Sequence, residues 1–138
     1  MTQRQGIEGG CSCGAIRYRS TAAPTGRTLC HCESCRRAAG APTVAWVIFP
    51  AEAFAIVAGT LRERRSSEYV TRSFCGDCGT PLVYRSDRRP DVVDVPTATL
   101  DEPDAFVPER EIWTGEKLAW EVINPSLPQF PRSSTEAI

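Results

Sequence analysis

Short runs of apolar residues, some of them alternating with polar residues, recur along the chain and predict β-strands. Six runs carry this pattern, at residues 16–19, 44–49, 54–58, 68–74, 81–85 and 92–95. Segments rich in proline, glycine, aspartate and serine separate the runs, and such segments are typical of tight turns. The pattern therefore predicts a mainly β fold made of antiparallel sheets joined by short loops.

Helical signals are few. Only residues 35–39 and 103–106 are typical of short helical turns, and eleven prolines argue against long helices. The segment that follows residue 113 lacks periodicity, and we expect it to lie over the sheet as an extended arm. Its expected anchors are the aromatic side chains of Trp113, Trp120 and Phe130. We expect residues 1–132 to form a single domain and residues 133–138 a disordered tail.

The charge of the chain gives no electrostatic reason to expect a nucleic acid or a membrane as partner. Sixteen basic residues against seventeen acidic ones leave a net charge of −1. The basic residues are concentrated at the start, because residues 1–40 carry +4 (six basic, two acidic) and residues 73–138 carry −6 (six basic, twelve acidic). The longest apolar run, residues 45–49, is far too short to span a bilayer. No signal-peptide pattern precedes it, so we expect a cytoplasmic protein.

Seven cysteines provide the clearest chemical signal. In a reducing compartment closely spaced cysteines indicate metal binding rather than disulfides, and an odd number of thiols favours the same interpretation. The cysteines fall into three groups, namely Cys11 and Cys13, then Cys30, Cys32 and Cys35, and finally Cys75 and Cys78.

The first and last groups share one design, a pair of cysteines followed by a glycine. Cys75 and Cys78 form a CxxCG zinc knuckle, in which the glycine can take positive φ so that both thiolates face one ion. Cys11 and Cys13 supply a second pair, and the two pairs together complete a tetrahedral site that closes a long loop. We therefore predict a structural zinc site with these four ligands. The spacing alone leaves open that the first pair joins the central group instead.

Three cysteines remain for a second site. Cys30, Cys32 and Cys35 would leave one position of a zinc ion open, which is the arrangement of catalytic zinc. Such an ion lowers the pKa of a bound water and deprotonates a coordinated thiol. Arg36 and Arg37 follow directly, and we expect them to pair with a carboxylate of an incoming ligand.

The single histidine, His31, lies between two of these cysteines. A residue between two ligands tends to point away from their ion, so we expect His31 beside the ligands or on the surface rather than on the metal. Two alternatives remain for the central group. His31 or a distant residue could close it as a second structural site, or the site could be partly empty in the isolated protein.

The cysteines lie in three blocks that resemble a known family. The blocks are GGCSCGAIRY at residues 9–18, CHCESCRRAAGAP at 30–42 and FCGDCGTPLVYRSD at 74–87. The sequence is similar to the glutathione-dependent formaldehyde-activating enzyme family, which also includes centromere protein V. The similarity continues through EIWTGEKLAW at 111–120 and LPQFP at 127–131, and therefore spans nearly the whole chain.

This resemblance implies a β-tent fold with two zinc ions, a structural and a catalytic one. The family reaction condenses formaldehyde with glutathione to S-hydroxymethylglutathione and is classed with the carbon–sulfur lyases. The leading expectation is thus a zinc-dependent enzyme acting on a small thiol adduct, with a thiol and an aldehyde as its partners and glutathione as a co-substrate. The implied structural ligands are Cys11, Cys13, Cys75 and Cys78, and the implied catalytic ligands are Cys30, Cys32 and Cys35.

The sequence has two alternative interpretations besides an enzyme. A non-catalytic module could use the central cysteines to capture a thiol or to sense zinc. A chromatin or cytoskeletal adaptor, like the centromeric relative, is disfavoured because the chain has no basic or proline-rich extension.

One position departs from the family pattern, since Glu111 stands where many relatives carry histidine. If this position helps to shape the substrate pocket, it brings a negative charge there.

Overall fold

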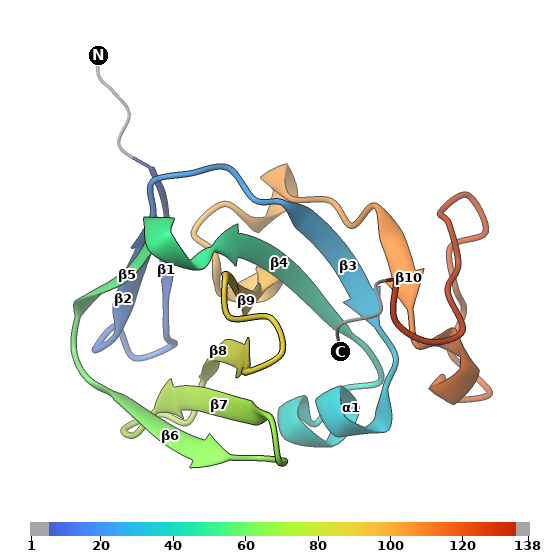
Figure 1. Ribbon diagram of the computed structural model, residues 1–138, viewed down its shortest axis with the longest axis horizontal. Coiled ribbons are helices and arrows are strands. Elements are labelled where there is room, and N and C mark those ends of the chain that lie inside the picture. Colours follow the sequence, from blue (N-terminus) through green and yellow to red (C-terminus); the bar gives the residue numbers. More distant parts are fainter. Residues whose placement is uncertain (1–5, 135–138) are drawn as a thin grey trace.

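The protein is described by a computed structural model that covers residues 6–134 and consists mainly of β-strands (Figure 1). The strands are β1 (Ile7–Gly10), β2 (Arg17–Ser20), β3 (Gly26–Cys30), β4 (Val44–Pro50), β5 (Phe54–Ala58), β6 (Leu61–Arg65), β7 (Val70–Cys75), β8 (Pro81–Ser86), β9 (Val92–Pro96) and β10 (Arg110–Ile112). The helical segments are α1 (Glu33–Ala39) and the short 3-10 turns Ala51–Ala53, Thr97–Thr99, Pro103–Ala105 and Thr114–Glu116. The prediction of a mainly β fold with few helical turns is confirmed.

The strands form two sheets. The smaller sheet has the order β1-β2-β5 and the larger has the order β10-β3-β4-β9-β8-β7-β6. All neighbouring strands are antiparallel except β10, which pairs in parallel with β3 at one edge of the larger sheet. Six strands correspond to the predicted runs. The pattern missed β1, β3, β6 and β10, and it missed the parallel pairing. The predicted disordered tail falls, apart from its first two residues, outside the described residues.

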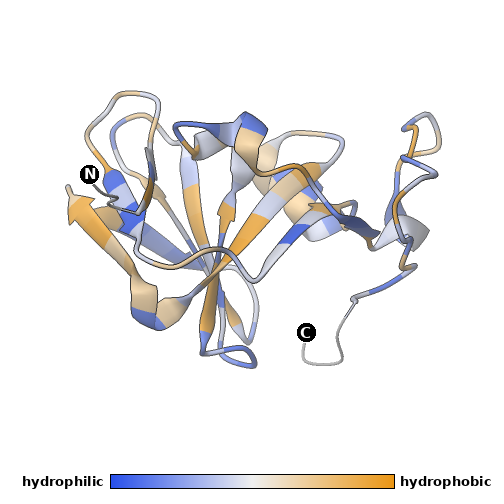
Figure 2. Ribbon diagram, turned by 90° about the horizontal axis from the view of Figure 1, so that it is seen from above, coloured by the Kyte–Doolittle hydropathy of each residue, from blue (hydrophilic) through white to orange (hydrophobic). Residues whose placement is uncertain are grey.

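Alternation along β4 divides the molecule into a core and a second face. Val47 and Phe49 are fully buried and pack towards the smaller sheet, where the Phe49 and Phe54 rings lie 6.4 Å apart. Burying each side chain of this size contributes roughly 1.5–3 kcal/mol. Trp46 and Ile48 point to the opposite face of the larger sheet because successive side chains alternate along a strand. Figure 2 shows the apolar residues concentrated in the strands at the centre of the molecule.

Helix α1 begins at a cysteine. Cys32 has extended backbone angles and its sulfur accepts a hydrogen bond from the Cys35 N–H at 3.3 Å, so it acts as the N-cap. The helix ends at Gly40, whose φ of 65° is left-handed and whose N–H donates to the Arg36 carbonyl. The prediction of a helical turn at 35–39 is therefore confirmed, with two further residues at its start. Figure 1 shows α1 between the ends of β3 and β7.

The segment after β10 turns back along its own strand. The Glu111 N–H donates to the Pro128 carbonyl, and the Glu111 carbonyl accepts from the Phe130 N–H at 2.9 Å. Trp113 and Phe130 are half-buried, as expected of anchors. The expectation for Trp120 is wrong, because this side chain is 70% exposed. No helix within residues 6–134 is long and apolar enough to span a membrane.

Candidate functional site

Four cysteines from two distant parts of the chain meet at one point. Cys11 and Cys13 lie in the turn after β1, Cys75 ends β7 and Cys78 lies in the turn that follows it. All four sulfurs lie within 4.8 Å of one another. The Cys11 and Cys13 sulfurs are 3.6 Å apart, and those of Cys13 and Cys75 are 3.8 Å apart. A tetrahedral zinc ion with bonds of about 2.3 Å holds its sulfur ligands about 3.8 Å apart. The donor set therefore fits a structural zinc ion.

The turns that carry these four cysteines have the expected backbone conformation and supply hydrogen-bond donors to some of the sulfurs. The glycine after each pair takes positive φ, 84° at Gly14 and 83° at Gly79, as the CxxCG pattern predicts. The Ile16 N–H donates to the Cys11 sulfur at 3.2 Å. Hydrogen bonds from Thr80 lower the pKa of Cys78 to about 5. These donors favour the ionised sulfur that a metal requires.

Three other cysteines meet where β3 leads into α1. Cys30 ends β3, Cys32 caps α1 and Cys35 lies in its first turn, and their sulfurs lie within 4.8 Å of one another. The Cys30 and Cys32 sulfurs are 3.4 Å apart. Hydrogen bonds with these two sulfurs, and secondarily the charge of Arg72, lower the pKa of Cys35 to about 3. Within residues 6–134 no fourth histidine, cysteine or carboxylate joins this group, so the donor set fits a zinc ion with three protein ligands.

The structure thus divides the seven cysteines into a group of four and a group of three. All seven are free thiols, and Cys11 and Cys13 join the last pair rather than the central group. That both groups bind zinc stays a prediction, supported by the sulfur spacing.

His31 and Glu111 are buried against each other. Each residue is 1% exposed, and the His31 Nε2 lies 2.6 Å from the Glu111 Oε1. His31 is therefore neither on the surface nor part of the three-sulfur group. Glu111 does not line the cavity that lies beside the three-sulfur group, so it adds no negative charge to the wall of that cavity. Glu111 instead gives His31 a buried partner.

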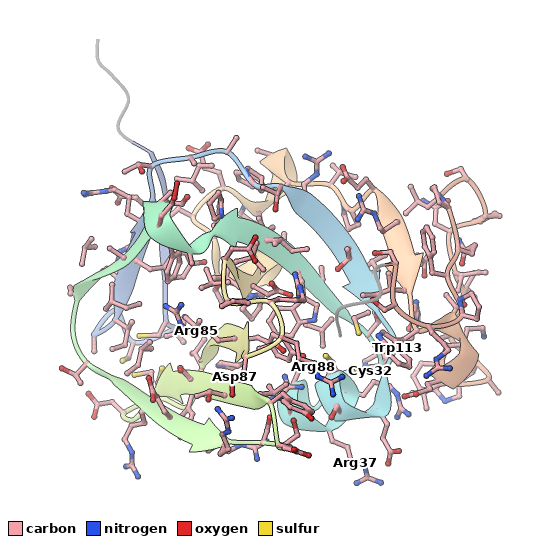
Figure 3. The ribbon with its side chains drawn as sticks, viewed as in Figure 1. Cys32, Arg37, Arg85, Asp87, Arg88 and Trp113 are labelled. Atoms are coloured by element: carbon pink, nitrogen blue, oxygen red, sulfur yellow. The ribbon has the colours of Figure 1, made fainter. Side chains whose placement is uncertain are left out.

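A cavity of about 540 Å³ lies beside the three-sulfur group. Cys30, Cys32 and Cys35 form part of its wall, whereas none of the other four cysteines lines it. Strands β3, β4, β7, β8, β9 and β10 and helix α1 also contribute to the wall. Figure 3 shows Cys32 and Trp113, which both line the cavity, on the side of the molecule where α1 lies.

Strand register places a row of polar side chains along the cavity. Arg72 on β7 lies opposite Tyr84 on β8, and Tyr84 lies opposite Asp94 on β9. Directly opposite residues on adjacent strands face the same side of a sheet, and all three line the cavity. The sequence analysis missed this row. Its one local signal is Asp94, a single acid between the fully buried Val93 and Val95.

The residues of this row differ in their partners. The Arg72 Nη2 lies 3.8 Å from the Cys35 sulfur, and its guanidinium lies over the Tyr84 ring at 4.9 Å. Burial raises the pKa of Tyr84 to about 12. Burial also raises the pKa of Asp94 to about 6, against the opposing charge of Arg89 at 3.5 Å.

The two arginines expected to bind a ligand carboxylate have other contacts. The Arg36 guanidinium donates to the His31 and Glu116 carbonyls and does not line the cavity. Arg37 lies at the cavity wall but pairs with Glu33 at 2.9 Å, and its side chain is 80% exposed. Figure 3 shows Arg37 projecting away from α1. Their role in ligand binding stays a prediction.

Comparison with known proteins assigns the chain to a family. The family model described as "Glutathione-dependent formaldehyde-activating enzyme" matches residues 6–116, which is most of the chain. The chain belongs to this family. The matched segment includes all seven cysteines, whereas two residues of the cavity wall, Ser133 and Ser134, lie beyond it.

A solved structure with a similar fold supports the fold assignment. Among the curated proteins that were searched, none matches the chain. The crystal structure of a Rhodobacter sphaeroides protein, a Northeast Structural Genomics target, is similar with a TM-score of 0.58 and 18% identity. The similarity covers 89% of this chain and 98% of the other. At this level of identity the likeness shows that this member of the glutathione-dependent formaldehyde-activating enzyme family shares its fold with that protein.

Proposed function

We propose that the chain is a zinc-dependent enzyme of the carbon–sulfur lyase type that forms or cleaves an adduct of a small thiol and an aldehyde. Glutathione and formaldehyde, the pair in the family's name, are its proposed substrates. The observation that carries the proposal is the position of Cys30, Cys32 and Cys35, which gather three sulfurs in the wall of a cavity. The four-sulfur group lies away from this cavity, as a purely structural site would.

The cavity has the size and the walls for such a ligand. Small-molecule sites are typically about 300–1,000 Å³, and this cavity of about 540 Å³ falls within that range. Trp46 and Trp113 supply apolar surface that excludes water. Arg89 and Arg110 supply positive charge, which suits a thiol that carries carboxylates, as glutathione does.

Each part of the site has a separate task in the proposed reaction. A zinc ion held by the three sulfurs would bind the substrate thiol in its ionised form. The cavity walls would orient the thiol and hold the aldehyde close to it, which reduces the entropic cost of bringing two molecules together. A cytoplasmic location, where cysteines stay reduced and able to bind zinc, is part of this proposal.

The test compares adduct formation with and without the three-sulfur site. The zinc-loaded protein is expected to accelerate the exchange between formaldehyde, glutathione and their adduct, measured by NMR above the uncatalysed rate. Cys32→Ser is expected to lose the acceleration and to stay folded, because serine is also a favourable N-cap for α1. Ser12→Ala, which changes an exposed residue between two ligands of the other group, serves as the matched control.

Two results would contradict the proposal. A wild-type protein that binds glutathione without accelerating the exchange would be a non-catalytic thiol-binding module. An acceleration that survives in Cys32→Ser would place the chemistry elsewhere. Zinc content measured on the same samples, with two ions expected in the wild type, separates a lost metal from a lost activity.

A further inference from the structure

Arg72 and Tyr84 form a pair of hydrogen-bond donors beside the three-sulfur group. They lie directly opposite each other on β7 and β8, and both line the cavity. The Arg72 guanidinium lies over the Tyr84 ring at 4.9 Å, and its Nη2 is 3.8 Å from the Cys35 sulfur. The pair is therefore held next to the place where a bound thiol would react.

The donors of this pair are largely unused. A guanidinium has five N–H donors, and Arg72 uses one of them, at Nη2, for its hydrogen bond to the Cys35 sulfur. Within residues 6–134, Arg72 makes no ion pair with a carboxylate, unlike its neighbours in the cavity wall such as Arg89. The Tyr84 hydroxyl likewise makes no hydrogen bond to any residue in that range. Polar groups left without partners in a cavity wall are available to a ligand.

The position of Tyr84 is fixed from two sides. Its ring lies 5.6 Å from the Trp46 ring, tilted by 56°, and the Arg72 guanidinium lies over it. The hydroxyl of Tyr84, whose pKa is raised by burial above the ordinary value for tyrosine, is neutral at physiological pH and can donate a hydrogen bond. Donors held in place before the reaction stabilise developing charge without the cost of reorganising.

We propose that Arg72 and Tyr84 bind the oxygen of the aldehyde and stabilise the negative charge that develops on it. This inference rests on the proposed function. When the thiolate sulfur forms a bond to the aldehyde carbon, the π electron pair of the carbonyl moves to oxygen and creates an alkoxide. Arg72 and Tyr84 donate hydrogen bonds to that oxygen. A proton from water, equivalent to the one that the thiol released, then gives the hydroxymethyl product.

A purely structural role for Arg72 makes a different prediction. If Arg72 only balanced the charge of the sulfurs, its loss would weaken metal binding, and the Tyr84 hydroxyl would have no effect. The oxyanion role requires both residues and leaves the zinc content unchanged. Tyr84→Phe is therefore the decisive variant, because it removes one oxygen atom and keeps the ring that packs on Trp46.

The experiment uses two small thiols and the zinc-loaded protein. Mercaptoacetate carries a carboxylate whose oxygens are separated from the sulfur by two carbons, whereas one carbon separates the alkoxide oxygen of the adduct from its sulfur. It therefore places a negative charge close to the position of the alkoxide. Ethanethiol is the neutral counterpart. The affinity of each thiol is measured by calorimetry for the wild type, Tyr84→Phe, Arg72→Gln and Arg72→Lys. Tyr69→Phe is the matched control, because Tyr69 also packs under an arginine, with the Arg88 guanidinium 3.8 Å from its ring.

The expected result is a preference of the wild type for mercaptoacetate of about tenfold or more. Tyr84→Phe and Arg72→Gln should reduce this preference at unchanged zinc content and unchanged ethanethiol affinity. Arg72→Lys should keep part of it, and Tyr69→Phe all of it. In the exchange assay, Tyr84→Phe and Arg72→Gln should lower kcat by about tenfold or more with little change in KM.

Two results would overturn the inference. The first is a wild type without preference for mercaptoacetate, and the second is a preference that Tyr84→Phe and Arg72→Gln leave intact. A wild type that prefers mercaptoacetate but does not accelerate adduct exchange would contradict the proposed function and still support an anion site at these two donors. The binding and exchange measurements therefore distinguish the two failures.

Discussion

The His31 Nε2 lies 2.6 Å from the Glu111 Oε1, and this contact joins two segments that are eighty residues apart in the sequence. His31 lies between two cysteines of the three-sulfur group, and Glu111 lies on β10 at the edge of the larger sheet. The other oxygen of Glu111 accepts from the Asn124 N–H at 2.5 Å. One buried carboxylate therefore holds the loop that carries the three sulfurs and the segment that returns along β10.

Glu111→Ala is expected to destabilise the fold by about 3 kcal/mol or more, because it leaves the buried His31 without its partner and also removes the acceptor of the Asn124 N–H. Glu111→Gln keeps an acceptor and should cost less. Urea denaturation gives the free energy of unfolding, and chelator competition should show weaker zinc retention in the Ala variant. Glu109→Ala is the control, because the Glu109 side chain is 37% exposed and its ion pairs contribute little. Equal losses in Glu111→Ala and Glu109→Ala would contradict this account.

The two cysteine groups are expected to differ in their effect on stability. Cys75→Ser removes a ligand that links the two sheets, and it should unfold or severely weaken the protein, because metal-binding energy is folding energy at a structural site. Cys35→Ser should leave the protein folded. Thermal unfolding followed by circular dichroism measures both variants. A common melting temperature for the two would show that the division into structural and catalytic groups is incorrect.

Trp46 and Trp120 are expected to differ strongly although both are tryptophans. Trp46 is 7% exposed and packs on Tyr84, so Trp46→Ala should cost about 3–5 kcal/mol. Trp120 is 70% exposed, so Trp120→Ala should change the free energy of unfolding by less than about 0.5 kcal/mol. Chemical denaturation of the two variants in parallel measures the difference. A loss of several kcal/mol in Trp120→Ala would mean that this loop packs on the sheet in solution.

The protein is expected to become less stable as the pH rises from about 4 to about 6, because Asp94 loses its proton at a higher pH in the folded state than in the unfolded state. Burial raises the pKa of Asp94 in the folded state to about 6 from the model-compound value of 3.8. Between these values the folded state holds a proton that the unfolded state has released, so stability falls with pH by up to about 3 kcal/mol and is constant above about 6. Asp94→Asn should remove this dependence.

The measurement for Asp94 is the difference between the two proteins. Urea denaturation gives the free energy of unfolding of the wild type and of Asp94→Asn at pH 4.5 and 7.5. Because both proteins share the titration of the cysteines, its contribution cancels in the difference between their free energies. Part of the gain in the variant at pH 7.5 is offset, because Arg89 loses its partner. A difference between the two proteins that does not change with pH would mean that Asp94 is ionised throughout this range.

Much of the site could be predicted because its signals are local in sequence. The cysteine spacings and the glycines that follow them predicted the separation into four and three sulfurs. Strands with one buried face, such as β4 and β9, were predicted from their apolar runs. The strand β6 was missed because it lies at a sheet edge and most of its residues are exposed, so the sequence LRERR has no apolar face to reveal it.

The rest of the site depends on contacts that the sequence does not encode locally. The row of Arg72, Tyr84 and Asp94 exists only because β7, β8 and β9 are neighbours in a fixed register. A shift of one residue would turn these side chains to the other face. The pairing of His31 with Glu111 likewise requires the parallel edge strand β10, which is three residues long and too short to predict. Trp120 was misjudged because its aromatic character alone suggested burial.

Strand β4 separates the interior of the protein from the ligand space by the thickness of a single backbone. Val47 belongs to the core, and its two neighbours Trp46 and Ile48 line the cavity. A substitution that repacks the interior at Val47 would therefore shift the strand and reshape the chamber on its other side. Under the proposed function, the preference for a thiol is thus expected to respond to residues such as Val47 that do not line the cavity.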